Sequence, residues 1–249
     1  MANILEICVD SLASARAAIS AGADRLELCS ALAVGGLTPY AALLRQIRME
    51  SNISIRCLMR PRAGDFLYTE EELALLRLQI AELREAGADG FVIGCLTPDG
   101  TLDLEAMKPL ITACGHCGVT LHRAIDVSAN LERTYLDAMS LGIDTVLTSG
   151  GASSCLAGLD TIRSLISLRD RTQGPEVLIG AGVNASVIAR LRQEIPGACA
   201  FHMSGKKELE SRMKFRREGV PMGLPGLDEW HIQQTDLNAV QAARAALDE

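Results

Sequence analysis

Strict alternation of short β-rich runs with amphipathic helical segments is the feature that most constrains how this chain can fold. Eight runs rich in Val, Ile, Leu and Cys recur along it, at residues 3–9, 25–29, 53–59, 90–95, 119–122, 145–148, 177–179 and 199–202. The segments between them, such as 12–21, 70–86 and 186–194, repeat apolar residues every three or four positions. This pattern predicts parallel strands joined by crossover helices.

Closure of these strands into a barrel is favoured over a doubly wound open sheet. An open sheet usually carries a glycine fingerprint after its first strand, but residues 8–12 read Cys-Val-Asp-Ser-Leu. Three helical segments end on Ala-Gly-Ala-Asp or Leu-Gly-Ile-Asp, at 21–24, 86–89 and 141–144, which indicates serial repetition of one unit. The sequence therefore predicts an α/β fold, a (β/α)8 TIM-like barrel that forms one domain over residues 1–249, with its last helix within 228–247.

Composition excludes several classes of function. The net charge of −7 disfavours nucleic acid as a partner, because binding to a phosphate backbone needs a basic face. No charged segment followed by an apolar one opens the chain, and no apolar stretch of about 18 residues occurs, so we expect a soluble cytoplasmic protein with no membrane partner. The eight cysteines are scattered through apolar segments, which predicts reduced thiols.

A Glu-x-Cys pattern occurs twice, as Glu6 and Cys8 in the first strand and as Glu27 and Cys29 in the second. Because side chains alternate along a strand, all four should point into the barrel, with the two cysteines nearest its mouth. Thiols at matching positions on adjacent strands could share a soft Cu(I) ion, if the stagger of the barrel does not separate them. The alternative is that both cysteines are apolar core residues. The glutamates need partners, since an unpaired carboxylate inside a barrel is costly.

Arginines follow the third strand in the segment Arg60-Pro-Arg62-Ala-Gly-Asp-Phe. Two guanidinium groups in one short loop could bind an anionic ligand, or they could neutralise Glu6 and Glu27. The strand phase of Arg60 points inward. The sequence leaves these alternatives open.

Acid–base residues follow the fifth strand in His122-Arg123-Ala-Ile-Asp126. His, Arg and Asp together at the C-terminal end of a barrel strand are typical of catalysis. The sixth strand ends at Thr-Ser149-Gly-Gly, a glycine turn follows the seventh strand, and the eighth strand supplies inward-facing His202 and Ser204. Such turns can present backbone N–H groups to a phosphate.

Two other features are expected to lie outside this mouth. Cys114 and Cys117 resemble a redox or zinc motif, but they lie at the bottom of the barrel without a second ligand pair. Cys57 should pack against the helices. The basic stretch 206–217 is either a solvated face or an electropositive cover over the mouth.

These motifs together resemble those of the CutC family of copper-homeostasis proteins. The resemblance runs from the first strand to Met213–Arg216, and it includes Gly-Gly-Leu-Thr-Pro at 35–39 and the segments that contain Arg60 and His122. In this chain Ala63 replaces a family Gly, and Leu121 and Ile125 replace Phe. The resemblance implies a cytoplasmic TIM-like barrel, usually a homo-oligomer, with a role in copper tolerance. It also implies that Cys8 and Cys29 correspond to two cysteines proposed as copper ligands in animal members.

Two functions therefore remain open. The first is a copper-homeostasis protein that binds Cu(I) through Cys8 and Cys29, with no organic cofactor. The second is a barrel enzyme of isomerase, lyase or hydrolase type that acts on a small phosphorylated or carboxylated metabolite. In that enzyme His122 with Glu27 or Asp126 would move protons. The residues expected to bind the anion are Arg60, Arg62, Arg123, Ser149, His202 and Ser204.

Overall fold

Eight parallel strands close into a barrel in the computed structural model, which describes residues 3–220, 222–223, 226 and 228–249. Each strand pairs with its neighbours in sequence, and β8 pairs with β1, so the predicted (β/α)8 fold is confirmed. The strands are β1 Ile4–Val9, β2 Arg25–Leu28, β3 Ser54–Leu58, β4 Gly90–Ile93, β5 Gly118–Leu121, β6 Thr145–Thr148, β7 Glu176–Ile179 and β8 Ala200–Met203.

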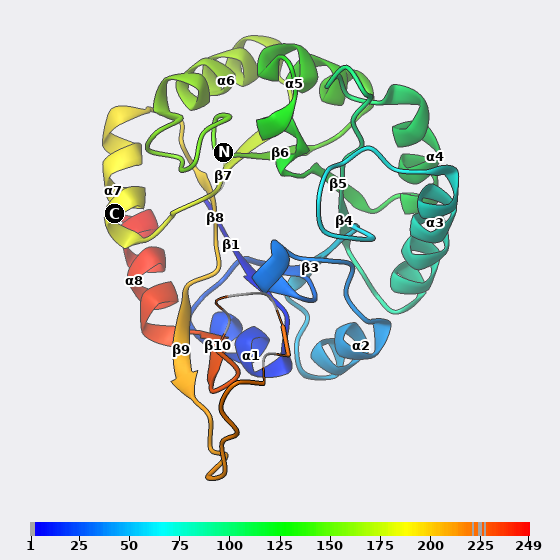
Figure 1. Cartoon of the computed structure of the whole chain (residues 1–249). Coiled ribbons are helices and arrows are strands. Elements are labelled where there is room, and N and C mark those ends of the chain that lie inside the picture. The colour runs from blue at the N-terminus through cyan, green and yellow to red at the C-terminus, as the bar shows by residue number, and fades with distance from the viewer. Residues whose placement is uncertain (1–2, 221, 224–225, 227) are drawn as a thin grey trace.

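A ring of helices surrounds the barrel (Figure 1). The α-helices of the described residues are α1 Leu12–Ser20, α2 Ala41–Glu50, α3 Glu70–Glu85, α4 Leu104–Cys114, α5 Leu131–Ser140, α6 Leu159–Thr172, α7 Ala185–Glu194 and α8 Leu237–Asp248. Two 3-10 helices, η1 Leu32–Val34 and η2 Arg123–Val127, lie in loops that follow β2 and β5. Among the helices of the described residues, none is both long and apolar enough to cross a membrane.

The strands divide their side chains between two environments. Outward-facing residues such as Leu5, Ile7 and Leu26 join the large core between the strands and the helices, and Cys57 belongs to the same core as expected. The barrel interior is mixed: a small apolar cluster that includes Leu147 fills part of it, while charged residues take other inward positions. Apolar residues outside and polar residues inside set up a polar site at the strand ends.

A two-stranded antiparallel sheet lies between β8 and the last helix. Its strands, β9 Lys206–Glu210 and β10 His231–Thr235, project from the barrel beside α1 (Figure 1). The segment 228–247, which was expected to supply the last helix, therefore also contains a strand. Residues 231–235 pair with β9, and the helix begins only after Asp236, whose side chain accepts a hydrogen bond from the amide of Asn238.

Candidate functional site

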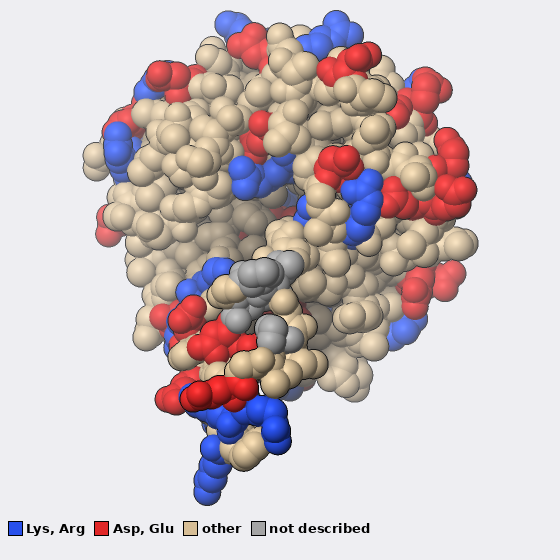
Figure 2. All heavy atoms as spheres, in the orientation of Figure 1, with Lys and Arg blue, Asp and Glu red and all other residues tan. Residues whose placement is uncertain are grey.

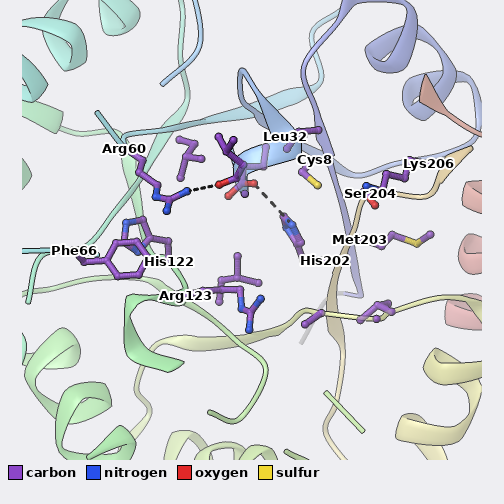
Figure 3. Close-up of a pocket in the computed structure, with 18 residues that line it drawn as sticks. Cys8, Leu32, Arg60, Phe66, His122, Arg123, His202, Met203, Ser204 and Lys206 are labelled. Atoms are coloured by element: carbon purple, nitrogen blue, oxygen red, sulfur yellow. Dashed lines mark hydrogen bonds and ion pairs between the residues drawn. The ribbon is translucent and has the colours of Figure 1, made fainter. Parts of the chain in front are cut away.

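A cavity of about 470 Å³ opens at the C-terminal ends of the strands. Basic side chains border the hollow on this face of the molecule (Figure 2), and Figure 3 shows residues from several strands pointing into it. The polar or ionisable residues that line the cavity are Cys8, Glu27, Arg60, His122, Arg123, His202, Ser204 and Lys206. The structure thus brings together most of the predicted site residues. Cys29, Arg62, Asp126 and Ser149 do not line the cavity.

A buried charged group lies below the cavity, where Glu6 of β1 meets Arg25 of β2 and His202 of β8. The strand register sets Glu6 beside both partners. Arg25 Nε donates to Glu6 Oε2, and His202 Nδ1 lies 2.8 Å from Glu6 Oε1. Burial alone would raise the pKa of Glu6, but Arg25 and His202 outweigh it and lower this pKa to about 2. Glu6 is therefore an anion, and Arg25, not Arg60 or Arg62, pairs with it.

Three potential metal ligands stand directly above this group. One ligand atom from each of Cys8, Glu27 and His202 lies within 4.8 Å of the other two. The register explains the grouping, because Cys8 pairs across β1 and β2 with Glu27. The Nδ1 atom of His202 contacts Glu6, so its Nε2 atom, 3.8 Å from Glu27 Oε2, is the nitrogen that faces the group. A histidine with a carboxylate on its far nitrogen is a common arrangement for metal ligands.

Ionisation within this group follows from burial and from mutual contact. Burial raises the pKa of the Glu27 carboxyl group. For His202, burial opposes protonation, but the neighbouring Cys8, Glu27 and Glu6 raise its pKa well above the ordinary value. These contacts favour a protonated imidazole between the two glutamates.

Cys29 does not lie at the same height as Cys8. In the pairing of β1 with β2, Cys8 lies opposite Glu27, which is two residues before Cys29. Cys29 itself follows the end of β2. Its Sγ atom lies 3.3 Å from Glu27 Oε2 and is fully buried, and burial together with Glu27 and Cys8 raises the pKa of this thiol well above its ordinary value. The condition for a shared thiol site is therefore not met in the strand register, because the stagger offsets the two cysteines along the strands, although both belong to one buried cluster with Leu58 and Val92.

His122 on the opposite wall is held as a neutral imidazole. Its Nδ1 atom accepts a hydrogen bond from the amide of Ala124 at 3.2 Å, which places the ring proton on Nε2. Burial and the nearby Arg60 lower the pKa of His122 to about 3. The ring fits because β4 is followed by Gly94: a Cβ at that position would lie 2.5 Å from the His122 ring.

The two arginines after β3 have different environments. Arg60 donates to the carbonyl oxygens of Val34, Gly36 and Gly64 and lies 5.4 Å from the centre of the Phe66 ring. It forms no ion pair with a carboxylate of the described residues. Arg62 instead pairs with two carboxylates, those of Asp65 and Glu72. The loop thus uses Arg62 for its own structure, which corrects its expected place in the anion site.

Asp126 organises the wall between β5 and β6. Its carboxylate accepts hydrogen bonds from Arg123 Nε, from the Thr148 hydroxyl, from the amide and hydroxyl of Ser149 and from the amide of Gly151. Arg123 also donates to the Ser149 hydroxyl at 2.8 Å. With its lone pairs occupied, Asp126 is placed to hold Arg123 at the cavity, and Ser149 supports the same contact. Neither is placed to touch a ligand.

Sequence reasoning missed Arg25 and the individual role of Lys206. Arg25 stands two residues before Glu27, so the alternation that placed Glu27 inside the barrel also predicts an inward Arg25 as the partner of Glu6. Lys206 lay within a basic stretch that was considered only as a whole, and no local signal separates it from Lys207. The structure does: Lys206 lines the cavity, whereas Lys207 pairs with Asp236.

The pair Cys114 and Cys117 lies away from the mouth, as expected. The Sγ atom of Cys114 contacts the carbonyl of Leu110 within α4, and that of Cys117 contacts the carbonyl of Ala88, just before β4. Both cysteines therefore lie at the N-terminal ends of the strands. All eight cysteines are free thiols in the structure.

We expect His122→Asn to flatten the pH dependence of the free energy of unfolding between about pH 6.5 and about pH 3. The folded-state pKa of about 3 lies below the ordinary 6.5, so in this window the unfolded chain binds a proton that the folded chain does not. The wild type should lose stability as pH falls, by up to about 1.4 kcal/mol per pH unit from this residue. Asparagine keeps an acceptor for the Ala124 amide. Urea unfolding at about pH 7 and about pH 5 measures the effect; a difference between variant and wild type that does not change with pH would contradict it.

The chain is thus a TIM barrel with a polar, partly buried site at the C-terminal mouth of its strands. The sequence model of the CutC family matches residues 3–207. A CutC family protein of Chromobacterium violaceum is 40% identical over 249 residues, which cover 100% of this chain and 99% of that protein. A human protein named copper homeostasis protein cutC homolog is 38% identical, over 97% of this chain and 88% of its own. The chain therefore belongs to the CutC family.

Solved structures agree with this assignment. The crystal structure of CutC from Streptococcus agalactiae superimposes with a TM-score of 0.76 at 27% identity and covers 81% of this chain and 98% of that one. Phosphoribosyl anthranilate isomerase from Thermotoga maritima superimposes with a TM-score of 0.56 at 13% identity, over 100% of this chain and 99% of its own. At that identity the second similarity concerns the fold alone.

Proposed function

We propose that this protein acts in copper homeostasis and binds Cu(I) at the mouth of its barrel, through Cys8 and His202 beside Glu27. The observation that carries the proposal is the convergence of these three side chains within 4.8 Å of one another. The name of the human relative supports the choice of copper. This ligand set replaces the expected pair of Cys8 and Cys29, because Cys29 contacts Glu27 and does not line the cavity.

The chemistry of the donor atoms suits this ion. A thiolate and an imidazole are the softer donors of the group, and thiolates select Cu(I) over harder ions. The contact of His202 Nδ1 with Glu6 leaves Nε2 to bind the metal and fixes the orientation of the ring. Glu27 supplies a harder oxygen donor that compensates positive charge.

A second cavity offers a route by which a cation could reach Cys8. It has a volume of about 540 Å³, lies beside the β9–β10 sheet and shares Cys8 with the first cavity. Its lining includes the acidic residues Asp10, Asp228 and Glu229, which outnumber the one lysine there, Lys206. Negative charge along an approach raises the local concentration of cations.

Cytoplasmic location and homo-oligomer formation are part of the same proposal. The eight free cysteines are consistent with a reducing compartment. Membership of the CutC family supports the expected oligomer. Both remain predictions.

Titration of Cu(I) against a competing chelator tests the copper site. We expect one tight site in the wild type and at least about a 100-fold loss of affinity in Cys8→Ala, because alanine removes the thiolate donor. Cys29→Ala is the matched control: it removes a thiol from the neighbouring strand and should keep most of the affinity. Cys114→Ala, at the other end of the barrel, should bind as the wild type does.

Three outcomes would contradict the proposal. Equal binding by wild type and Cys8→Ala would exclude a site at the mouth. Equal losses in Cys8→Ala and Cys29→Ala, with circular dichroism showing that both fold, would favour the two-cysteine site over the one with His202. Binding of Zn(II) in preference to Cu(I) at equal concentrations would contradict copper as the ion.

A further inference from the structure

The cavity extends beyond the Cys8, Glu27 and His202 group and carries positive charge that the protein does not compensate. Arg60 bonds only to backbone carbonyls, and Lys206 forms no ion pair among the described residues. Elsewhere this acidic chain commonly pairs its arginines with carboxylates, as Arg62 does with Asp65 and Glu72. Two free cationic groups at one cavity make it a site of positive potential in a chain of net charge −7.

His122 adds a hydrogen-bond donor that has no partner. Its side chain is buried, lines the cavity, and carries its proton on Nε2 because Nδ1 accepts the amide of Ala124. The Nε2 atom is fully buried and bonds to no described residue. The Nε atom of Arg60, on the same side of the cavity in Figure 3, is also buried without a partner. Donors left unpaired in a buried site cost free energy, and a ligand acceptor would recover it.

Backbone amides supply more donors on another wall. After β7 the chain turns through Ala181 and Gly182, which have positive φ angles of 70° and 78° and line the cavity. Among the described residues, none accepts a hydrogen bond from the amides of residues 181–183. Consecutive free amides in such a turn form a concave site for an anion.

We propose that this cavity binds a small phosphorylated metabolite, with the phosphate near Lys206 and the free amides of residues 181–183 and another oxygen of the ligand near Arg60 and His122 Nε2, on the opposite side of the cavity (Figure 3). A volume of about 470 Å³ falls within the usual range for small-molecule sites and exceeds what a single metal ion needs. Arg123, whose charge is paired with Asp126, adds N–H donors to the wall of the cavity. The proposal does not depend on copper, because none of these donors belongs to the Cys8, Glu27 and His202 group.

Calorimetric titration of the metal-free protein with inorganic phosphate and with glycerol 3-phosphate tests this site. We expect saturable binding of one equivalent, tighter for glycerol 3-phosphate than for inorganic phosphate, because the larger ligand also reaches His122. Lys206→Ala should weaken binding by about tenfold, the usual loss for one charge-assisted contact. Lys207→Ala is the matched control, since it removes the same charge from the next residue, whose partner is Asp236. It should bind as the wild type does.

His122→Asn distinguishes binding of the phosphate group from binding of the rest of the ligand. It keeps an acceptor for the Ala124 amide but removes the Nε2 donor, so it should weaken glycerol 3-phosphate and leave inorganic phosphate nearly unchanged. In the wild type, glycerol 3-phosphate should shift the Nε2–H signal of His122 in imidazole 15N spectra. Absence of saturable binding, or equal losses in Lys206→Ala and Lys207→Ala, would overturn the proposal. Cu(I) binding retained in Lys206→Ala would show that the two sites are independent.

Discussion

Arg25→Met is expected to lower the free energy of unfolding by about 3–5 kcal/mol, because it removes the arginine from the buried Glu6 carboxylate and leaves that carboxylate its contact with His202 alone. Glu6 is 1% exposed, and its pKa of about 2 depends on Arg25 and His202. Methionine fills much of the space of the arginine side chain. The loss in the free energy of unfolding should therefore come mainly from the buried Glu6 charge and less from a cavity. Chemical denaturation near neutral pH measures the change.

The double variant Glu6→Gln/Arg25→Met is the control. Glutamine keeps an oxygen for His202 but carries no charge, so the second substitution removes the stranded carboxylate. We expect the double variant to recover at least half of the stability lost in Arg25→Met, since replacement of a whole buried ion pair costs little. Additive losses from the two substitutions would contradict a buried Glu6–Arg25 pair.

Asp126→Ala is expected to lower the free energy of unfolding by about 3 kcal/mol or more, because several donors lose a charged acceptor at once. The side chain of Asp126 is 5% exposed and accepts from Arg123 Nε and from groups of Thr148, Ser149 and Gly151. The same change frees Arg123, so it should also weaken any anion bound in the cavity. Thermal and chemical unfolding, with calorimetry for the anion, measure both effects.

Asp160→Ala provides the comparison for Asp126. Asp160 also forms an ion pair with an arginine three residues away, Arg163, but its side chain is 95% exposed. Little or no change in stability is expected, as for most surface pairs. If both variants lost the same stability, the network around Asp126 would have no special structural role.

The barrel could be predicted from the sequence because its signal is repeated. Eight strand–helix units, each with alternation or helical periodicity, indicate the same architecture independently. The hairpin β9–β10 could not be predicted in this way. Its strands are mostly exposed and polar, and they pair only with each other, so they lack the apolar pattern that marks a barrel strand.

The sequence indicated which side chains point into the barrel. It did not indicate how residues on adjacent strands are placed relative to one another along the barrel. Alternation within a strand indicates which residues point inward, and it placed Cys8, Glu27, His122 and His202 at the mouth. The relative height of residues on adjacent strands depends on the stagger of the barrel, which no single strand encodes. This is why Cys8 faces Glu27 rather than Cys29.

The hydrogen-bond and ion-pair partners of each side chain could not be predicted from the sequence either. Arg60 and Arg62 belong to one short motif, yet Arg60 faces the cavity while Arg62 pairs with Asp65 and with Glu72 of α3. Asp126 looked like an acid–base residue, but contacts from β6 occupy its oxygens. Such partners come from distant segments and emerge only when the strands are assembled.

X-ray absorption spectroscopy of the Cu(I)-loaded protein identifies the ligands of the proposed copper site, because it counts the sulfur and nitrogen atoms bound to the ion. The proposed site supplies one sulfur, from Cys8, and one imidazole nitrogen, from His202, with Glu27 beside them. We expect a spectrum fitted by one sulfur with nitrogen or oxygen, and loss of the imidazole signal in His202→Ala. A spectrum with two sulfur ligands and no imidazole would contradict it.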